Sequence, residues 1–194
     1  LSFLILIYLF LISDFNFNLV YINSHSEKPV IYKLSGVWGN HEGSMLLWIL
    51  ILVLFNFLFA LSKKVSERFR NITIAIQSAM IFGFVAFLFF LSNPFDLNQN
   101  NYVDGIGLNP ILQDPLLAIH PPVLYIGYVG FSLVFSLAVA GLITKEVDKE
   151  WATIVKPWVF SAWAFLTAGI ALGSFWAYYE LGWGGYWFWD PVEN

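Results

Sequence analysis

Residues 123–143 read VLYIGYVGFSLVFSLAVAGLI and contain no charged side chain over 21 residues. A helix rises about 1.5 Å per residue, so a helix of this length crosses the roughly 30 Å hydrocarbon core of a bilayer. Three other segments, at 44–61, 72–91 and 158–176, are of similar length and also free of charge. The pattern predicts an all-α fold, a polytopic transmembrane helical bundle with about four full spans.

The composition agrees with a membrane protein and excludes several other classes. Of the 194 residues, 59% are hydrophobic and 11% are charged, whereas about 25% of the residues of a soluble domain are charged. The chain contains no cysteine, so it offers no disulfide, no thiolate metal site and no thiol nucleophile. Its net charge of −4 provides no basic surface for nucleic acid.

Prolines stand close to two of the predicted helix starts. Pro121 and Pro122 precede the segment 123–143, and Pro157 precedes the segment 158–176. Because proline is tolerated in the first turn of a helix, where no helical amide is lost, we expect these helices to begin at the prolines.

The opening run, residues 1–12, is apolar but shorter than the roughly 20 residues that a span requires. We expect it to be a truncated first helix. The chain starts with Leu1 rather than methionine and stops within a motif at Asn194. We therefore expect residues 1–194 to be a single membrane domain and a fragment of a longer protein.

The loops between the predicted spans fall into two sets of opposite charge. Loops 62–71 and 144–157 carry seven of the nine basic residues against four acids, a net charge of +3. Segments 13–43, 92–122 and 177–194 carry two basic residues against nine acids, a net charge of −7. The positive-inside rule places the first set in the cytoplasm or matrix and the second in the periplasm or intermembrane space. All three histidines lie in the second set.

An aromatic-rich segment ends the chain, GSFWAYYELGWGGYWFWDPVEN at 173–194, in which nine of the fifteen residues from Phe175 to Trp189 are aromatic. One interpretation is an interfacial belt among lipid headgroups, which suits Trp176 and Tyr178. The rings beyond the helix alternate with glycines, which let the backbone approach a partner closely. A docking surface for another protein and a platform for a planar cofactor therefore remain as alternatives.

His120 is the first candidate site on the predicted outer side. It directly precedes Pro121, and a residue before proline is disfavoured in helical geometry, so we expect His120 just outside the span. Its imidazole could ligate iron or form a structural hydrogen bond, and the residues alone leave both open.

The other two histidines are weaker candidates. His41 and Glu42 are adjacent and form either a proton-handling pair or, as we favour, a structural network that ties the loop to the bundle. Ser44 is a candidate N-cap of the helix that follows. His25 lies in a polar stretch and is expected to be solvated.

Three motifs resemble one family. WGGYWFWDPVEN at 183–194, WGNHEGSMLLW at 38–48 and HPPVLYIGYVG at 120–130 are similar to the tryptophan-rich "WWD" cytochrome c assembly family of membrane haem-handling proteins, and most similar to its haem lyase branch. The resemblance runs from about Tyr21 to Asn194. It implies that haem is held at the outer membrane surface and attached covalently to apocytochrome c.

The resemblance also implies roles for particular residues. His120 matches an outer-side histidine that ligates haem iron, and His41 with Glu42 is a secondary candidate. No catalytic residue is assigned. The loop 177–194 matches the haem-binding signature, and the implied platform for haem consists of Trp176, Trp183, Tyr186, Trp187, Trp189 and Asp190.

The implied cofactor is haem, with haem b as the substrate. The expected partners are a haem chaperone, apocytochrome c, other cytochrome c maturation subunits, the remainder of the protein and membrane lipid. We expect the chain to be part of a haem lyase complex and to be inactive alone. Two alternatives stay open: a haem transporter, against which the scarcity of polar residues in the spans argues, and a non-catalytic scaffold of the maturation complex.

The localisation follows from hydropathy and residue usage. The chain is expected to be a multi-pass protein of an inner membrane. Phe, Ile and Asn are abundant and Ala is scarce, as in AT-rich organelle genomes, so we favour the mitochondrial inner membrane over a bacterial cytoplasmic membrane.

Overall fold

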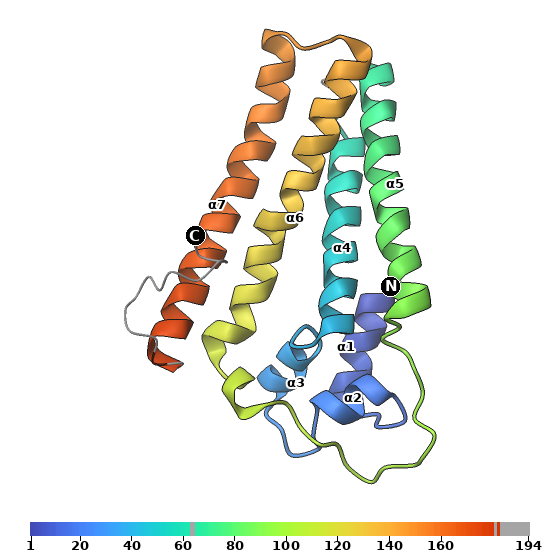
Figure 1. Ribbon diagram of the computed structural model, residues 1–194, viewed down its shortest axis with the longest axis vertical. Helices are drawn as coiled ribbons and strands as arrows, with labels where there is room; N and C mark the ends of the chain where they lie inside the picture. Colours follow the sequence, from blue (N-terminus) through green and yellow to red (C-terminus); the bar gives the residue numbers. More distant parts are fainter. Residues whose placement is uncertain (63–64, 181, 183–194) are drawn as a thin grey trace. The chain divides into compact units, whose positions relative to one another are not determined.

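The computed structural model describes residues 1–62, 65–180 and 182, and these form seven α-helices and one short 3-10 turn, η1 (Figure 1). Four of the helices, α4 to α7, are long and apolar enough to cross a membrane. The described residues contain no strand, which confirms the all-α prediction. The elements are α1 (Ser2–Ile12), α2 (Asn18–Asn23), α3 (Val30–Gly36), α4 (His41–Ala60), α5 (Glu67–Leu91), η1 (Pro110–Leu112), α6 (Pro115–Thr144) and α7 (Lys149–Glu180).

The long helices begin earlier than predicted. Pro121 and Pro122 lie inside α6, and Pro157 lies inside α7, so the prediction that these helices begin at the prolines is wrong. The reason is capping, because an Asp side chain upstream of each proline supplies an acceptor for the first helical amides. In α7, Asp148 Oδ1 accepts a hydrogen bond from the amide of Trp151 at 2.8 Å.

The start of α4 is also decided by a polar side chain before it. Asn40 Oδ1 accepts a hydrogen bond from the amide of Gly43 at 2.7 Å. Ser44, the predicted cap, instead donates its hydroxyl to the carbonyl of His41 at 2.9 Å. Asn40 is therefore the residue that satisfies the first amides of this helix.

The chain divides into two compact units. The first comprises residues 1–47, 87–122 and the chain from 170 onward, and the second comprises residues 48–86 and 123–169. All three histidines and the end of α7 belong to the first unit.

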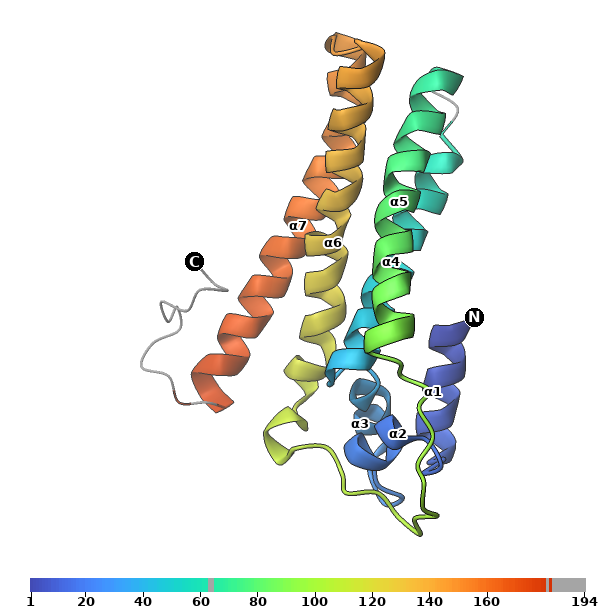
Figure 2. The same ribbon diagram turned by 45° about the vertical axis from the view of Figure 1, so that its right-hand side comes forward.

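In the first unit, the loop 92–114 runs along α2 and α3 (Figures 1 and 2). Backbone hydrogen bonds fix it there, from the amide of Asn18 to the carbonyl of Asp96 at 2.9 Å and from the amide of Ile106 to the carbonyl of Tyr21 at 2.8 Å. The ring of Tyr21 also stacks on that of Tyr102 at 3.8 Å between centroids. Hydrogen bonds and ring stacking thus hold the loop against the rest of this unit.

In the second unit, α6 and α7 approach closely along a line of small residues. A Cβ at Gly127 would overlap the backbone nitrogen of Leu166, and a Cβ at Gly169 would lie 2.5 Å from the Cα of Leu124. Small residues allow this backbone approach, which is a principal way of packing helices in lipid.

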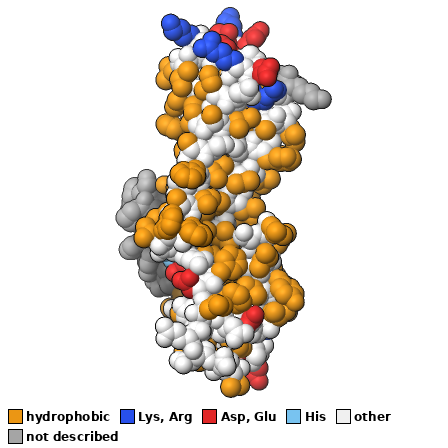
Figure 3. Space-filling view, turned by 90° about the vertical axis from the view of Figure 1, so that its right-hand side faces the viewer, with side chains coloured by type: hydrophobic (Ala, Val, Ile, Leu, Met, Phe, Trp, Pro, Cys, Tyr) orange, Lys and Arg blue, Asp and Glu red, His pale blue; other side chains and the backbone are white. Residues whose placement is uncertain are grey.

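The two basic loops of the second unit lie together. The hydroxyl of Ser66, between α4 and α5, donates to a carboxylate oxygen of Glu146, between α6 and α7, at 3.2 Å. Lysine and arginine side chains gather around these loops (Figure 3). The grouping of these loops into one set is therefore confirmed.

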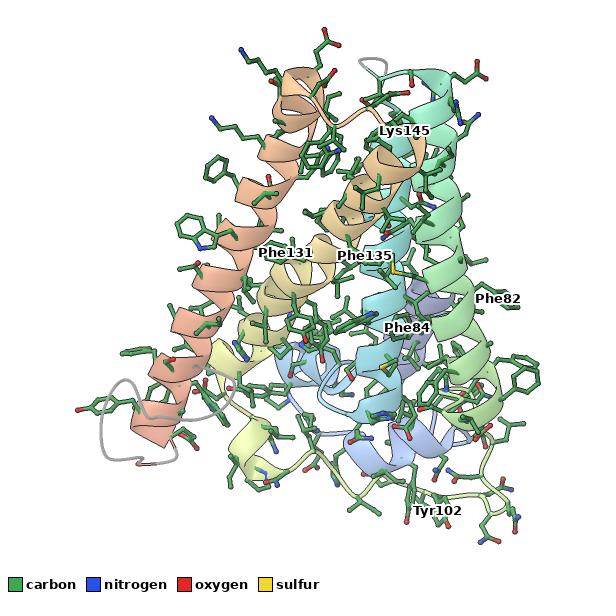
Figure 4. The ribbon with its side chains drawn as sticks, turned by 45° about the horizontal axis from the view of Figure 1, so that its top comes forward. Phe82, Phe84, Tyr102, Phe131, Phe135 and Lys145 are labelled. Carbon is green, nitrogen blue, oxygen red and sulfur yellow. The ribbon has the colours of Figure 1, made fainter. Side chains whose placement is uncertain are left out.

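The second unit also contains a buried polar network that the sequence analysis underestimated. Gln77 on α5 is fully buried; its amide nitrogen donates to Ser132 Oγ at 2.8 Å, and its amide oxygen accepts from Ser136 Oγ at 2.8 Å. The polar groups satisfy one another between α5 and α6, so they serve helix packing. By contrast, Phe82 on α5 is 74% exposed and projects outward, as expected for a ring that faces lipid (Figure 4).

Candidate functional site

The candidate site is built around His120, which lies in the second turn of α6. Asp114 caps the helix, because its Oδ1 accepts hydrogen bonds from the amides of Leu116 at 2.8 Å and Leu117 at 3.0 Å. The prediction that His120 lies outside the helix is therefore wrong. The capped start outweighs the conformational preference of the residue before a proline.

The ring of His120 packs directly against α7 at Gly173. A Cβ built on Gly173 would lie 2.6 Å from Cε1 and 3.0 Å from Nδ1 of the imidazole. A real Cβ is essentially never found at 2.6 Å, so the imidazole occupies the place where any other residue would have a side chain and would have to move if one were added. Gly173 lies two residues before Phe175, the first ring of the aromatic-rich segment.

A tryptophan steadies the helix turn that carries His120. The indole Nε1 of Trp38 donates a hydrogen bond to the carbonyl oxygen of Ala118 at 3.0 Å. In an α-helix this carbonyl would accept from the amide of residue 122, which is a proline and has no N–H. The indole therefore replaces the missing backbone donor.

The end of α7 presents several aromatic side chains. Trp176 lies three residues after Gly173 and hence on the same helix face. It is half-buried, and its buried Nε1 has no hydrogen-bond partner among the described residues. Phe175 and Tyr179 form an edge-to-face pair with centroids 5.4 Å apart. Helix α7 continues to Glu180, so the first four residues of the predicted haem-binding loop are helical.

The rest of the predicted platform lies outside the described residues. This applies to Trp183, Tyr186, Trp187, Trp189 and Asp190. Their roles stay predictions from the sequence.

His41 has a structural partner, as favoured from the sequence. It is the first residue of α4, and its Nδ1 lies 3.0 Å from Ser92 Oγ, just beyond the end of α5. Its ring also meets that of Phe87 edge-to-face at 6.3 Å. Glu42 lines a separate recess with Ser92 and Asp96. The hydrogen bond ties the start of α4 to the end of α5.

His25 is only partly solvated. Its side chain is 40% exposed, and Nε2 lies 3.4 Å from Oδ2 of Asp104. The hydroxyl and the backbone amide of Ser26 also donate to Asp104, and these bonds lower the pKa of Asp104 to about 2. The histidine and the carboxylate thus form a polar corner that joins 25–26 to the loop 92–114.

At the contact between His120 and Gly173, the structure offers the imidazole of His120 as a nitrogen ligand. Within residues 1–62, 65–180 and 182, no three His, Cys, Asp or Glu side chains come close enough to hold a metal ion. An imidazole held between two helices can serve as one axial ligand of a haem iron. Indole and phenol rings on the next turn offer apolar surface for a planar molecule.

Three residues that shape this site were not predicted from the sequence: Asp114, Trp38 and Gly173. Two of them carried a usable signal. Asp114 precedes Pro115 and so resembles an N-cap before a proline at the first helical position. The signal for Trp38 is indirect: a proline within a helix leaves one carbonyl without its backbone donor, and a side chain such as an indole can supply that donor. The role of Gly173 depends on the packing of α6 against α7 and has no local signal.

Comparison with known proteins identifies the family. The profile of the family described as "Cytochrome C assembly protein" matches residues 38–194. The chain is 56% identical over 194 residues to the "Cytochrome c-type biogenesis protein ccl1" of Rhodobacter capsulatus, which covers all of this chain and 30% of that protein. It is 47% identical over 195 residues to the "Cytochrome c-type biogenesis protein CcmF" of Escherichia coli, and this match covers 100% of this chain and 30% of that protein.

A solved structure agrees with these relatives. The fold is similar to a chain named "Cytochrome c Heme Lyase CcmF", with a TM-score of 0.81 and 32% identity, covering all of this chain and 30% of that one. The chain thus spans about 30% of the length of the relatives it matches. The relatives named here are bacterial and lend no support to a mitochondrial location. With most of its length matched by the family profile, the chain belongs to the cytochrome c assembly protein family.

Proposed function

We propose that the chain is the amino-terminal part of a membrane subunit of a cytochrome c haem lyase, which holds haem b as the substrate for attachment to apocytochrome c. The observation that carries the proposal is the packing of the His120 ring on Gly173, which sets an imidazole against the helix that leads into the aromatic segment. Family membership and the similarity to a haem lyase support it.

In this proposal, His120 is the axial ligand of the haem iron. Trp183, Trp187 and Trp189 supply the rings on which the porphyrin rests, and Trp176 and Tyr186 are further members of the platform. Each ring pair contributes about 0.5–1.5 kcal/mol beyond burial, so several rings are needed to hold haem without a covalent bond. Asp190 orients the loop or contacts a partner.

The described residues are compatible with haem. Gly173 lacks the Cβ that would displace the imidazole. The half-buried indole of Trp176 on the same helix face has an N–H without a partner among the described residues, and a polar group of a ligand could accept a hydrogen bond from it. The covalent step adds a cysteine S–H of the apocytochrome across a haem vinyl group, forming one C–S and one C–H bond. The thiols therefore come from the partner, in keeping with the absence of cysteine in this chain. Positioning vinyl beside thiol supplies much of the rate enhancement.

The proposed partners are a haem chaperone, apocytochrome c, other maturation subunits and the remainder of the protein. The proposed location is an inner membrane, with the histidines and the aromatic segment on the side opposite the basic loops, following the positive-inside rule. Residue usage alone favours a mitochondrial origin.

The test is His120→Ala in the full-length protein, with His25→Ala as the control because His25 is paired with Asp104 elsewhere in the same unit. We expect His120→Ala to lose most of the co-purifying haem and to abolish cytochrome c maturation, and His25→Ala to keep both. Normal haem content in His120→Ala would refute the proposal. Trp187→Ala distinguishes the proposal from the scaffold alternative when haem content and co-purifying partner proteins are both measured. The scaffold alternative predicts lost partners with unchanged haem, whereas the proposal predicts lost haem.

A further inference from the structure

Helix α6 contains a local defect beside the proposed haem ligand. Pro121 and Pro122 follow His120 directly and lack backbone N–H groups. Their helical partners would be the carbonyls of residues 117 and 118. Ala118 is only 5% exposed, so solvent cannot readily satisfy its carbonyl.

The segment that carries Trp38 is well anchored. Val37 is completely buried, and the amides of Trp38 and Gly39 both bond to the carbonyl of Ser35, at 3.2 Å and 2.8 Å. The indole therefore projects from a firm turn at the end of α3 when it donates to the carbonyl of Ala118.

We infer that Trp38 is a positioning residue for His120. It supplies the hydrogen bond that Pro122 cannot make, holds the first two turns of α6 in one orientation, and so directs the imidazole onto Gly173. The inference rests on the proposed role of His120 as a haem ligand. Proline-containing helices bend where the backbone ladder is interrupted, and a ligand must be held within about 0.5 Å of its productive position.

The experiment is a double-mutant cycle in the full-length protein. Trp38→Phe removes the N–H and keeps an aromatic ring, while Pro122→Ala restores a backbone N–H for the carbonyl of Ala118. In the natural background we expect Trp38→Phe to weaken haem binding about tenfold and to shift the Soret band. In the Pro122→Ala background we expect Trp38→Phe to change haem affinity less than about twofold, because the indole donor is then redundant.

The matched control is Trp48→Phe, since the Nε1 of Trp48 is buried and has no hydrogen-bond partner among the described residues. We expect this variant to keep its haem affinity and Soret band. A second measurement needs no haem: amide hydrogen exchange of residues 115–124 should speed up in Trp38→Phe and return to normal when Pro122→Ala is added.

The outcomes separate the inference from the proposed function. If Trp38→Phe weakens haem binding equally in both backgrounds, the indole acts by packing and the inference is wrong. The inference is also wrong if Trp38→Phe changes nothing while His120→Ala loses haem, although the proposed function then stands. If His120→Ala keeps haem, the proposed function fails, and the positioning role fails with it.

Discussion

At the scale of single residues, the absence of a side chain at position 173 matters most. An added methyl group would lie 2.6 Å from the imidazole of His120, so Gly173→Ala must displace the ring or separate α6 from α7 at this point. Overpacking of this kind costs about 1–3 kcal/mol. We expect Gly173→Ala to lower haem affinity about tenfold in the full-length protein, measured by haem titration.

Gly83 on α5 offers a matched control, because a Cβ there would meet no atom within 4 Å. Gly83→Ala also adds one methyl group to a long apolar helix and should leave haem affinity unchanged. Equal effects of the two substitutions would show that the loss reflects general helix disturbance rather than contact with His120.

Lys28 makes the free energy of unfolding of the first unit depend on pH. It is 8% exposed, and its Nζ donates to the carbonyl of Asn23 at 3.0 Å. Burial, with a smaller contribution from Lys33, lowers its pKa from 10.5 to about 8. Between these values the unfolded chain binds more protons than the folded chain, so the free energy of unfolding should rise with pH across this window.

Thermal unfolding of the purified protein at several pH values checks this prediction, with Lys28→Met as the comparison. Methionine keeps the apolar stem and cannot ionise, so the variant should lose the part of the pH dependence between about pH 8 and 10. An identical pH profile in both proteins would contradict the prediction.

At the scale of elements, the pair α5 and α6 is joined by the amide of Gln77. Hydrogen bonds between transmembrane helices contribute about 0.6 kcal/mol each on average. Gln77→Leu removes the two bonds to Ser132 and Ser136. We expect it to lower the free energy of unfolding by about 1 kcal/mol, as measured by denaturant titration in detergent.

Thr167→Val is the control for this experiment, because the hydroxyl of Thr167 bonds within its own helix, to the carbonyl of Trp163 at 2.8 Å. This substitution should cost clearly less than Gln77→Leu. A Gln77→Leu protein as stable as the natural one would mean that apolar packing replaces the network fully.

Element boundaries were the weakest part of the sequence reasoning, for a definite reason. The apolar runs identified all four long helices, because hydropathy over about 20 residues is an additive local property. The prolines led to wrong helix starts. The free-energy cost of a proline inside a helix depends on whether a donor such as Trp38 or a cap such as Asp114 is present. Trp38 is distant in sequence from the helix that it contacts, and Asp114 lies in a segment that the hydropathy pattern predicts to be a loop.

At the scale of the whole molecule, the charge of the loops predicts sidedness. The absence of natural cysteine in this chain lets single cysteines report accessibility, in a full-length background freed of any other cysteine. Asn100→Cys, in the acidic set, should react with a membrane-impermeant thiol reagent added outside. Glu150→Cys, in the basic set, should react only after permeabilisation.

Both positions are exposed, so accessibility within the protein does not limit the comparison. Labelling of both cysteines from the same side would contradict the predicted topology. Labelling with the sides reversed would place the histidines with the cytoplasm or matrix and remove the basis for haem handling on the outer side.

The sequence by itself determined the fold class, the number of long helices, the grouping of the loops by charge and the family, because each of these depends on local composition or on contiguous motifs. It also singled out His120. Only the tertiary structure decided how that imidazole is held, because the bond from Trp38 to Ala118 and the contact of His120 with Gly173 join residues far apart along the chain through the packing of the first unit. A hydrogen bond or steric contact between distant residues depends on the folded backbone, which no local pattern specifies.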